Sequence, residues 1–157
     1  MRRTLAALLV AALAVLLIGC DSTQSTVDDD VEYGTWNLAR SVILTRTTTV
    51  LSQAPSAITV TDATLTLSRS SVSGVSTAAA GTAALSMLVG GQTWTYSGTF
   101  TRNGNELLAR DLVATGSVAE GYVDLTMNLS SSSSMTGTLQ YQDGATYTYR
   151  GTAIFGK

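Results

Sequence analysis

The chain of 157 residues contains no histidine, one cysteine and one proline. Without histidine it has no imidazole base for Ser-His-Asp or Cys-His catalysis, and it lacks the nitrogen ligands that zinc sites commonly use. A disulfide within the chain would need a second cysteine, and a thiolate nucleophile would need a base to deprotonate it. We therefore expect no catalytic residues, no metal site and no cofactor, and we predict that the protein is not an enzyme.

The single cysteine, Cys20, follows a short apolar run. Arg2 and Arg3 give the chain a positive start, and fourteen uncharged residues follow from Leu5 to Ile18. This run is too short to cross the roughly 30 Å hydrocarbon core as a helix, and its order is typical of a secretion signal. We predict that residues 1–19 are removed from the mature protein.

The residues Leu17-Ile18-Gly19-Cys20 resemble the lipobox of bacterial lipoproteins. The resemblance implies that the Cys20 sulfur receives a diacylglyceryl group and that Cys20 becomes the acylated first residue. Two or three acyl chains would attach the protein stably to a membrane. The expected location is the bacterial cell envelope, outside the cytoplasm. Asp21 resembles the inner-membrane retention signal of enteric bacteria, but the choice between inner and outer membrane stays open.

The acidic residues are concentrated near the predicted lipidation site. Residues 20–30 carry four acids and no base, whereas residues 31–157 carry seven acids and seven bases. The first segment is too polar to offset its own ordering entropy, so we predict a flexible acidic tether. Its run Asp28–Asp30 could alternatively ligate calcium. Residues 31–157 have the length of one domain, and their neutral balance argues against a nucleic-acid partner.

From Val31 onward the composition suits β-strands and shows no helical stripe. Gly90-Gly91 and Asn103-Gly104 are typical of two-residue hairpin turns. Gln142–Gly144 is interpreted as a three-residue loop with Gly144 left-handed, and Ser130–Ser134 as a five-residue loop. These turns separate six strands. Earlier runs add two or three more strands, around Glu32–Arg40, Val42–Leu51 and Ala57–Ser68. The Ala-rich stretch 77–84 is the one place where a short helix competes.

These registers place the large apolar side chains on one face and Ser, Thr and Gln on the other. The apolar face contains Leu85, Met87, Trp94, Tyr96, Phe100, Leu107, Val123, Leu125, Met127, Leu129, Leu139, Tyr141, Tyr147, Tyr149 and Phe155. Eight or nine antiparallel strands of this kind can close on themselves and remove their edges. We therefore predict an all-β fold, an antiparallel up-and-down meander closing into a barrel. In this register Gly137 lies opposite Tyr149.

The segment Tyr33-Gly34-Thr35-Trp36 resembles the glycine-x-tryptophan motif on the first strand of lipocalins. The resemblance implies a lipocalin-like barrel in which Gly34 and Trp36 belong to the motif that closes one end. In that family an arginine near the last strand packs on the tryptophan. Arg150 is the only arginine there, although the predicted register points it outward.

The resemblance and the aromatic face together predict that the barrel binds a small apolar or amphipathic ligand. The expected ligand-binding residues are Trp94, Tyr96, Phe100, Tyr147 and Tyr149 as the wall and Asp111 as a polar handle. Alternatively, these aromatics fill the barrel, and the domain is a solid structural or interaction module of the envelope, an inhibitor or assembly partner without a pocket. The sequence names no protein partner.

The sequence leaves several placements open for Asp111. The predicted register places it on the aromatic face opposite Tyr96, where a carboxylate without a partner would be unfavourable. It binds a polar end of the ligand, is satisfied by tyrosine hydroxyls and water, or is exposed by a bulge. A slip of one residue would instead turn Arg110 inward.

Overall fold

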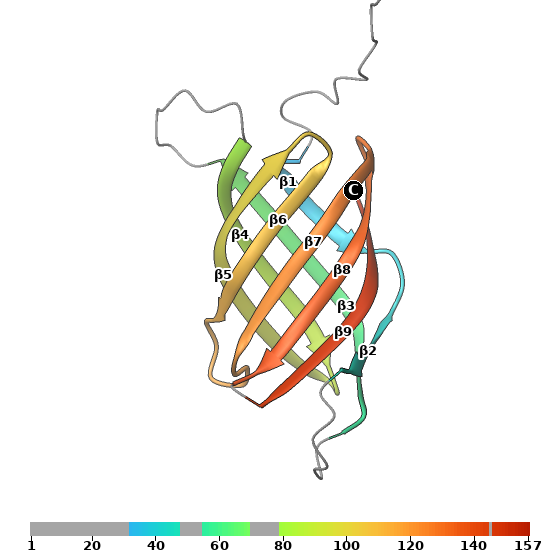
Figure 1. Cartoon of the computed structure of the whole chain (residues 1–157), viewed down its shortest axis with the longest axis vertical. Helices are drawn as coiled ribbons and strands as arrows, with labels where there is room; N and C mark the ends of the chain where they lie inside the picture. Colours follow the sequence, from blue (N-terminus) through green and yellow to red (C-terminus); the bar gives the residue numbers. More distant parts are fainter. Residues whose placement is uncertain (1–31, 48–54, 70–78, 145) are drawn as a thin grey trace, which may run out of the picture.

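The computed structural model describes residues 32–47, 55–69, 79–144 and 146–157, and their regular structure is entirely β-strand (Figure 1). The strands are β1 (Gly34–Leu38), β2 (Val42–Arg46), β3 (Ala57–Arg69), β4 (Ala79–Val89), β5 (Gln92–Asn103), β6 (Glu106–Ala114), β7 (Tyr122–Ser131), β8 (Ser134–Asp143) and β9 (Tyr147–Gly156). The predicted signal segment 1–19, Cys20 and the tether 20–30 lie outside the described residues.

The strands close into a barrel. Their hydrogen-bonded order is β1-β3-β2-β9-β8-β7-β6-β5-β4, and β3 also pairs with β4. Both β1 and β2 run antiparallel to β3 and to β9, at opposite ends of those strands. β1 and β2 therefore lie end to end and together occupy the place of one strand. The nine strands thus form a barrel wall that is eight strands around. The predicted all-β, antiparallel meander that closes into an eight- or nine-stranded barrel is confirmed.

Two of the predicted hairpin registers are confirmed. Leu85 pairs with Tyr96 across a turn in which Gly90 and Gly91 have φ of +57° and +81°, values that glycine adopts without strain. Leu125 pairs with Leu139 across the β7–β8 turn as predicted, but the predicted five-residue loop Ser130–Ser134 is wrong, because Ser131 pairs with Ser134 and the turn is shorter.

The β5–β6 register differs from the prediction by two residues. The turn is formed by Gly104 and Asn105, so Asn103 pairs with Glu106. Phe100 consequently faces Ala109 and not Leu107. A shift of two keeps the alternation of side chains, so Phe100, Leu107 and Ala109 remain inward as predicted.

The β8–β9 register differs by four residues. Tyr141 pairs with Tyr149, and the predicted pairing of Tyr141 with Ala145 is wrong. Gly144 is left-handed as expected, with φ of +52°, but it follows β8 instead of ending a loop of residues 142–144. Gly137 faces Ala153, so the prediction that Tyr149 covers Gly137 is also wrong.

The core fills the barrel interior. The predicted apolar face is buried throughout, except for Trp94 and Tyr147, which are half-buried and packed against the core. The first three strands add inward side chains at Trp36, Val42, Leu44, Val60, Leu65 and Leu67. Burying each such side chain contributes about 1.5–3 kcal/mol. The helical alternative is wrong for residues 79–84, which belong to β4.

Candidate functional site

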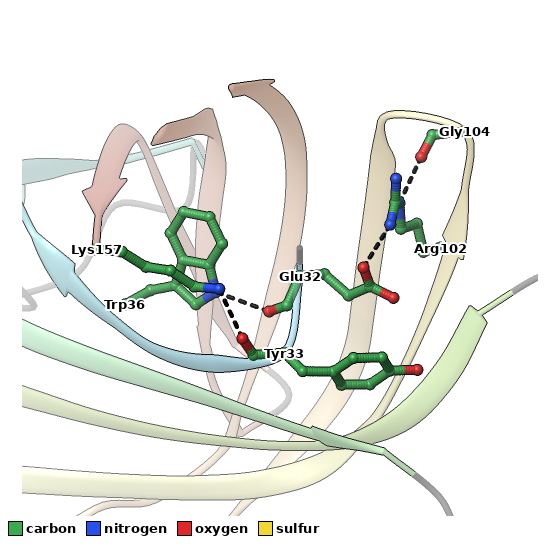
Figure 2. A network of polar contacts seen from close by, with 6 residues as sticks. All are labelled: Glu32, Tyr33, Trp36, Arg102, Gly104 and Lys157. Atoms are coloured by element: carbon green, nitrogen blue, oxygen red, sulfur yellow. Dashed lines mark hydrogen bonds and ion pairs between the residues drawn. The ribbon is translucent and has the colours of Figure 1, made fainter. Parts of the chain in front are cut away.

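One end of the barrel, which we call the Glu32 end, carries the start of β1, the β5–β6 turn and Lys157 (Figure 2). Trp36 is fully buried there, and its indole Nε1 donates a hydrogen bond of 2.8 Å to the backbone oxygen of Glu32. The Lys157 Nζ lies 4.5 Å from the centroid of the Trp36 ring and donates a hydrogen bond of 2.6 Å to the backbone oxygen of Tyr33. Burial lowers the pKa of Lys157 below its usual value.

A buried ion pair occupies the same end. The Arg102 guanidinium donates to the Glu32 carboxylate, and the Arg102 Nε donates to the Gly104 oxygen at 2.6 Å (Figure 2). The side chains of Arg102 and Glu32 are 8% and 0% exposed. The second carboxylate oxygen of Glu32 is buried and has no donor among the described residues. The Glu32 end is thus closed by paired charges and rings.

The sequence reasoning missed this pair, although one signal was present. Alternation from Phe100 puts Arg102 on the inward face of β5, next to the turn. A guanidinium in that position requires a carboxylate, because an unpaired buried charge is strongly unfavourable. Glu32 is the acidic residue that precedes the glycine-x-tryptophan motif.

The position expected of an arginine over Trp36 is taken by a lysine. Arg150 is exposed on the outer surface of β9, opposite Thr45 of β2. The lipocalin-derived pairing of Arg150 with Trp36 is therefore wrong. Lys157 supplies the cation because it follows the last residue of β9 and lies beside Gly34, the first residue of β1, where a Cβ atom would lie 3.7 Å from the Lys157 Nζ.

The opposite end, which we call the Trp94 end, gathers four aromatic side chains. The Tyr141 ring centroid lies 5.3 Å from that of Trp94, 6.4 Å from that of Tyr96 and 5.9 Å from that of Tyr149. Tyr141 and Tyr149 are stacked, with 21° between their planes, because they are cross-strand partners. This aromatic cluster comes from β5, β8 and β9.

A hollow of about 430 Å³ lies beside the aromatic cluster. It is lined by Pro55, Ala57, Ile58, Thr59, Val89, Gly90, Trp94, Tyr141, Asp143 and Tyr149. The lining is mainly apolar and aromatic, and its volume lies in the range of sites for small molecules. Its wall comes from the ends of β3, β4, β8 and β9, from β5, and from Pro55 and Gly90 next to β3 and β4.

The tyrosines of the cluster remain neutral phenols. Burial is the main cause that raises the pKa of Tyr141 to about 12, with Asp143 and Glu120 as further causes. Burial also raises the pKa of Tyr96, whose hydroxyl donates a hydrogen bond of 3.3 Å to the backbone oxygen of Glu120. The Tyr149 hydroxyl donates to the Pro55 oxygen at 3.2 Å.

The structure brings together only part of the predicted ligand wall. Trp94 and Tyr149 line the hollow, and Tyr96 packs behind Tyr141. Phe100 lies far from them, near the Glu32 end, where its ring contacts Tyr33 edge-on. Tyr147 is half-buried, with the Arg46 guanidinium 5.7 Å from its ring centroid.

Asp111 and Arg110 both face solvent. Asp111 has φ of +52° at a bulge, and its backbone N–H donates to Asp124 Oδ1 at 2.8 Å. The bulge turns Leu112 inward, and Tyr96 pairs with Ala114. Of the three alternatives for Asp111 the bulge is the one observed; neither Asp111 nor Arg110 faces the interior, and the expectation of Asp111 as a polar handle for the ligand is wrong.

In the described ranges no three metal-ligating side chains lie together, and no helix there is long and apolar enough to cross a membrane. The predicted lipidation site Cys20 lies outside these ranges.

No protein-family model and no curated protein sequence matches the chain. Among solved structures, the chain is similar to a redesigned β-barrel, with 12% identity and a TM-score of 0.48, over 82% of this chain and 92% of that one. The functional evidence therefore lies in the barrel's own side chains.

Proposed function

We propose that the protein is a lipid-anchored, lipocalin-like barrel of the bacterial cell envelope that binds a small apolar or amphipathic molecule and catalyses no reaction. The observation that carries the binding proposal is the 430 Å³ hollow at the Trp94 end, with three aromatic rings in its lining. The ligand would sit at this mouth. Deeper in the barrel, side chains such as Trp36, Leu65 and Phe155 are fully buried.

The anchor proposal rests on the sequence of residues 1–20. An acylated Cys20 would be followed by eleven residues before Glu32, a reach of at most about 3.5 Å per residue. Since Glu32 lies at the end opposite the hollow, such an anchor would hold the Glu32 end toward the membrane. The hollow would then face away from the bilayer.

Two variants of isoleucine test the binding proposal. Ile58 lines the hollow, whereas Ile43 on the neighbouring strand is 64% exposed on the outer surface. We expect the neutral dye N-phenyl-1-naphthylamine to bind the domain from Val31 with a rise in fluorescence, and Ile58→Asp to abolish that rise. Ile43→Asp should leave it intact. Equal dye binding by both variants would contradict a ligand in the hollow.

The alternative of a solid interaction module is favoured by the completely buried middle of the barrel. Native mass spectrometry of the domain purified from cells distinguishes the two. A co-purified small molecule supports the binding proposal, and a bare mass together with no dye uptake supports the module. For the anchor, Cys20→Ser should release the full chain from the membrane fraction.

A further inference from the structure

The one charged side chain in the described lining of the hollow is negative. The lining contains one carboxylate, Asp143, and the hydroxyls of Thr59, Tyr141 and Tyr149, but no lysine or arginine. The Tyr149 hydroxyl already donates its proton to the Pro55 oxygen, so it can offer the hollow only lone pairs. The Trp94 Nε1 is buried and therefore not presented to a ligand.

Asp143 belongs to the inner surface of the barrel. It follows Leu139 and Tyr141 at intervals of two on β8, and it pairs with Tyr147 of β9. No hydrogen bond or ion pair to its carboxylate is found within the described part of the chain. A carboxylate at the mouth of an apolar hollow attracts a positive partner more strongly than one in bulk water.

The charge of Asp143 acts on the neighbouring tyrosine rings. Burial is the main cause of the raised pKa values of Tyr96, Tyr141 and Tyr149, and Asp143 contributes to each in the same direction. Glu120 adds to the effect at Tyr141. Asp143 therefore acts on all three rings, although at Tyr149 the nearby Arg46 has the larger and opposite effect on the pKa.

Aromatic faces add a second attraction for cations. The negative face of an indole or phenol ring attracts an ammonium or guanidinium group within about 6 Å. Arg46 makes a cation–π contact of this kind at the same end of the barrel, where its guanidinium lies over the ring of Tyr147. Arg46 does not line the hollow, so it leaves Trp94, Tyr141 and Tyr149 to a ligand.

We propose that the hollow at the Trp94 end selects an organic ammonium cation, whose charged group lies among Trp94, Tyr141 and Tyr149 and beside the Asp143 carboxylate. This inference rests on the proposed function, because it names the class of ligand that the same hollow takes. An anionic ligand would meet the carboxylate of Asp143 and no lining cation. A neutral apolar ligand would leave the carboxylate without a partner.

The test compares choline with 3,3-dimethylbutan-1-ol, a neutral molecule of nearly the same shape in which carbon replaces the ammonium nitrogen. Binding is measured by isothermal titration calorimetry on the domain from Val31 and on the full chain. We expect choline to bind about tenfold more tightly than the neutral alcohol, the ratio that a cation–π contact and one carboxylate supply together.

Two aspartate variants test whether Asp143 causes the preference for choline. Asp143→Asn should reduce the preference for choline over the alcohol from about tenfold to about threefold, the part that the aromatic faces supply, while alcohol binding changes less than about twofold. Asp62→Asn is the matched control, since Asp62 is exposed on β3 and does not line the hollow. It removes the same charge and should leave both affinities unchanged. Circular dichroism of each variant checks that the barrel is folded.

The outcomes separate the two proposals. If the alcohol binds as tightly as choline, the cation inference is overturned and the apolar binding site stands. If neither compound binds but the neutral dye does, the cation inference is again overturned. If neither compounds nor dye bind, both proposals fall. A choline preference as large in Asp143→Asn as in the parent protein would place the cation elsewhere and would also overturn the inference.

Discussion

Glu32 and Arg102 are 70 positions apart in the sequence and form an ion pair inside the barrel. Their contact ties the residue that precedes β1 to the end of β5, across the Glu32 end. Since both side chains are buried, removal of either one leaves the charge of the other in the interior without a partner. Charges of this kind are far more sensitive to substitution than surface pairs.

We predict that Arg102→Met lowers the free energy of unfolding by about 3–5 kcal/mol, because the Glu32 carboxylate would remain buried without a partner. Urea denaturation followed by circular dichroism measures the change. The double variant Glu32→Met/Arg102→Met should recover much of the loss, since paired apolar replacements leave no uncompensated charge.

Arg110→Met is the matched control for that prediction. Arg110 is exposed on β6, and its replacement should change the free energy of unfolding by less than about 0.5 kcal/mol. Equal urea midpoints for Arg102→Met and Arg110→Met would contradict the burial of the ion pair.

Gly137 lies where β8 approaches β7 too closely for a side chain. A Cβ atom there would lie 2.0 Å from the Thr126 oxygen and 2.6 Å from the Met127 Cα. Gly137→Ala should therefore destabilise the barrel by about 1–3 kcal/mol. Gly156→Ala is the control, because its nearest contact would be an ordinary 3.6 Å to the Ser133 oxygen. Thermal denaturation of the two variants tests the difference, and equal melting temperatures would refute it.

The sequence predicts the barrel well because strand alternation tolerates errors in turn placement. The β5–β6 and β8–β9 registers differ from the prediction by two and four residues, and both shifts are even numbers because displacing a turn by one residue changes the register by two. Phe100 and Tyr141 therefore stay inward with different partners. What fixes the true registers is packing across the whole barrel, which a local turn pattern does not contain.

The site was predicted less well, for two physical reasons. The bulge at Asp111 inserts an extra residue and reverses the alternation, and no glycine or asparagine at that position signals it. The hollow also depends on residues distant in the sequence, such as Pro55, Ile58 and Asp143. Only closure of the barrel brings them beside Trp94 and Tyr149, the two predicted wall residues that line it.

The buried tyrosines predict a loss of stability in alkali. In the folded protein Tyr141 keeps its proton until about pH 12, whereas an unfolded tyrosine loses it near pH 10. The unfolded state then binds fewer protons, so the free energy of unfolding falls as the pH rises from about 10 to 12. Tyr96 acts in the same direction, and Lys157, whose pKa is lowered, acts in the opposite one.

Urea midpoints between pH 8.5 and 11.5 measure this dependence. We expect a flat region up to about pH 9.5 and a decline above it. Tyr141→Phe should make the decline shallower, since phenylalanine has no proton to lose. A midpoint that stays constant through pH 11.5 would show that the phenols ionise as readily in the folded barrel as in the unfolded chain.

Asp111 offers the sharpest test of the bulge. Its φ of +52° is tolerated by Asp, Asn and Gly but is unfavourable for a β-branched residue. Asp111→Asn should therefore leave the free energy of unfolding within about 0.5 kcal/mol of the parent, and Asp111→Val should lower it by about 1–2 kcal/mol. The backbone hydrogen bond to Asp124 Oδ1 is present in all three proteins, so it does not account for the difference. Arg110→Val, at the neighbouring exposed position where φ is not positive, should be nearly neutral. If valine were tolerated equally at both positions in urea denaturation, residue 111 would not occupy the left-handed conformation, and the inward placement of Leu112 would need another cause.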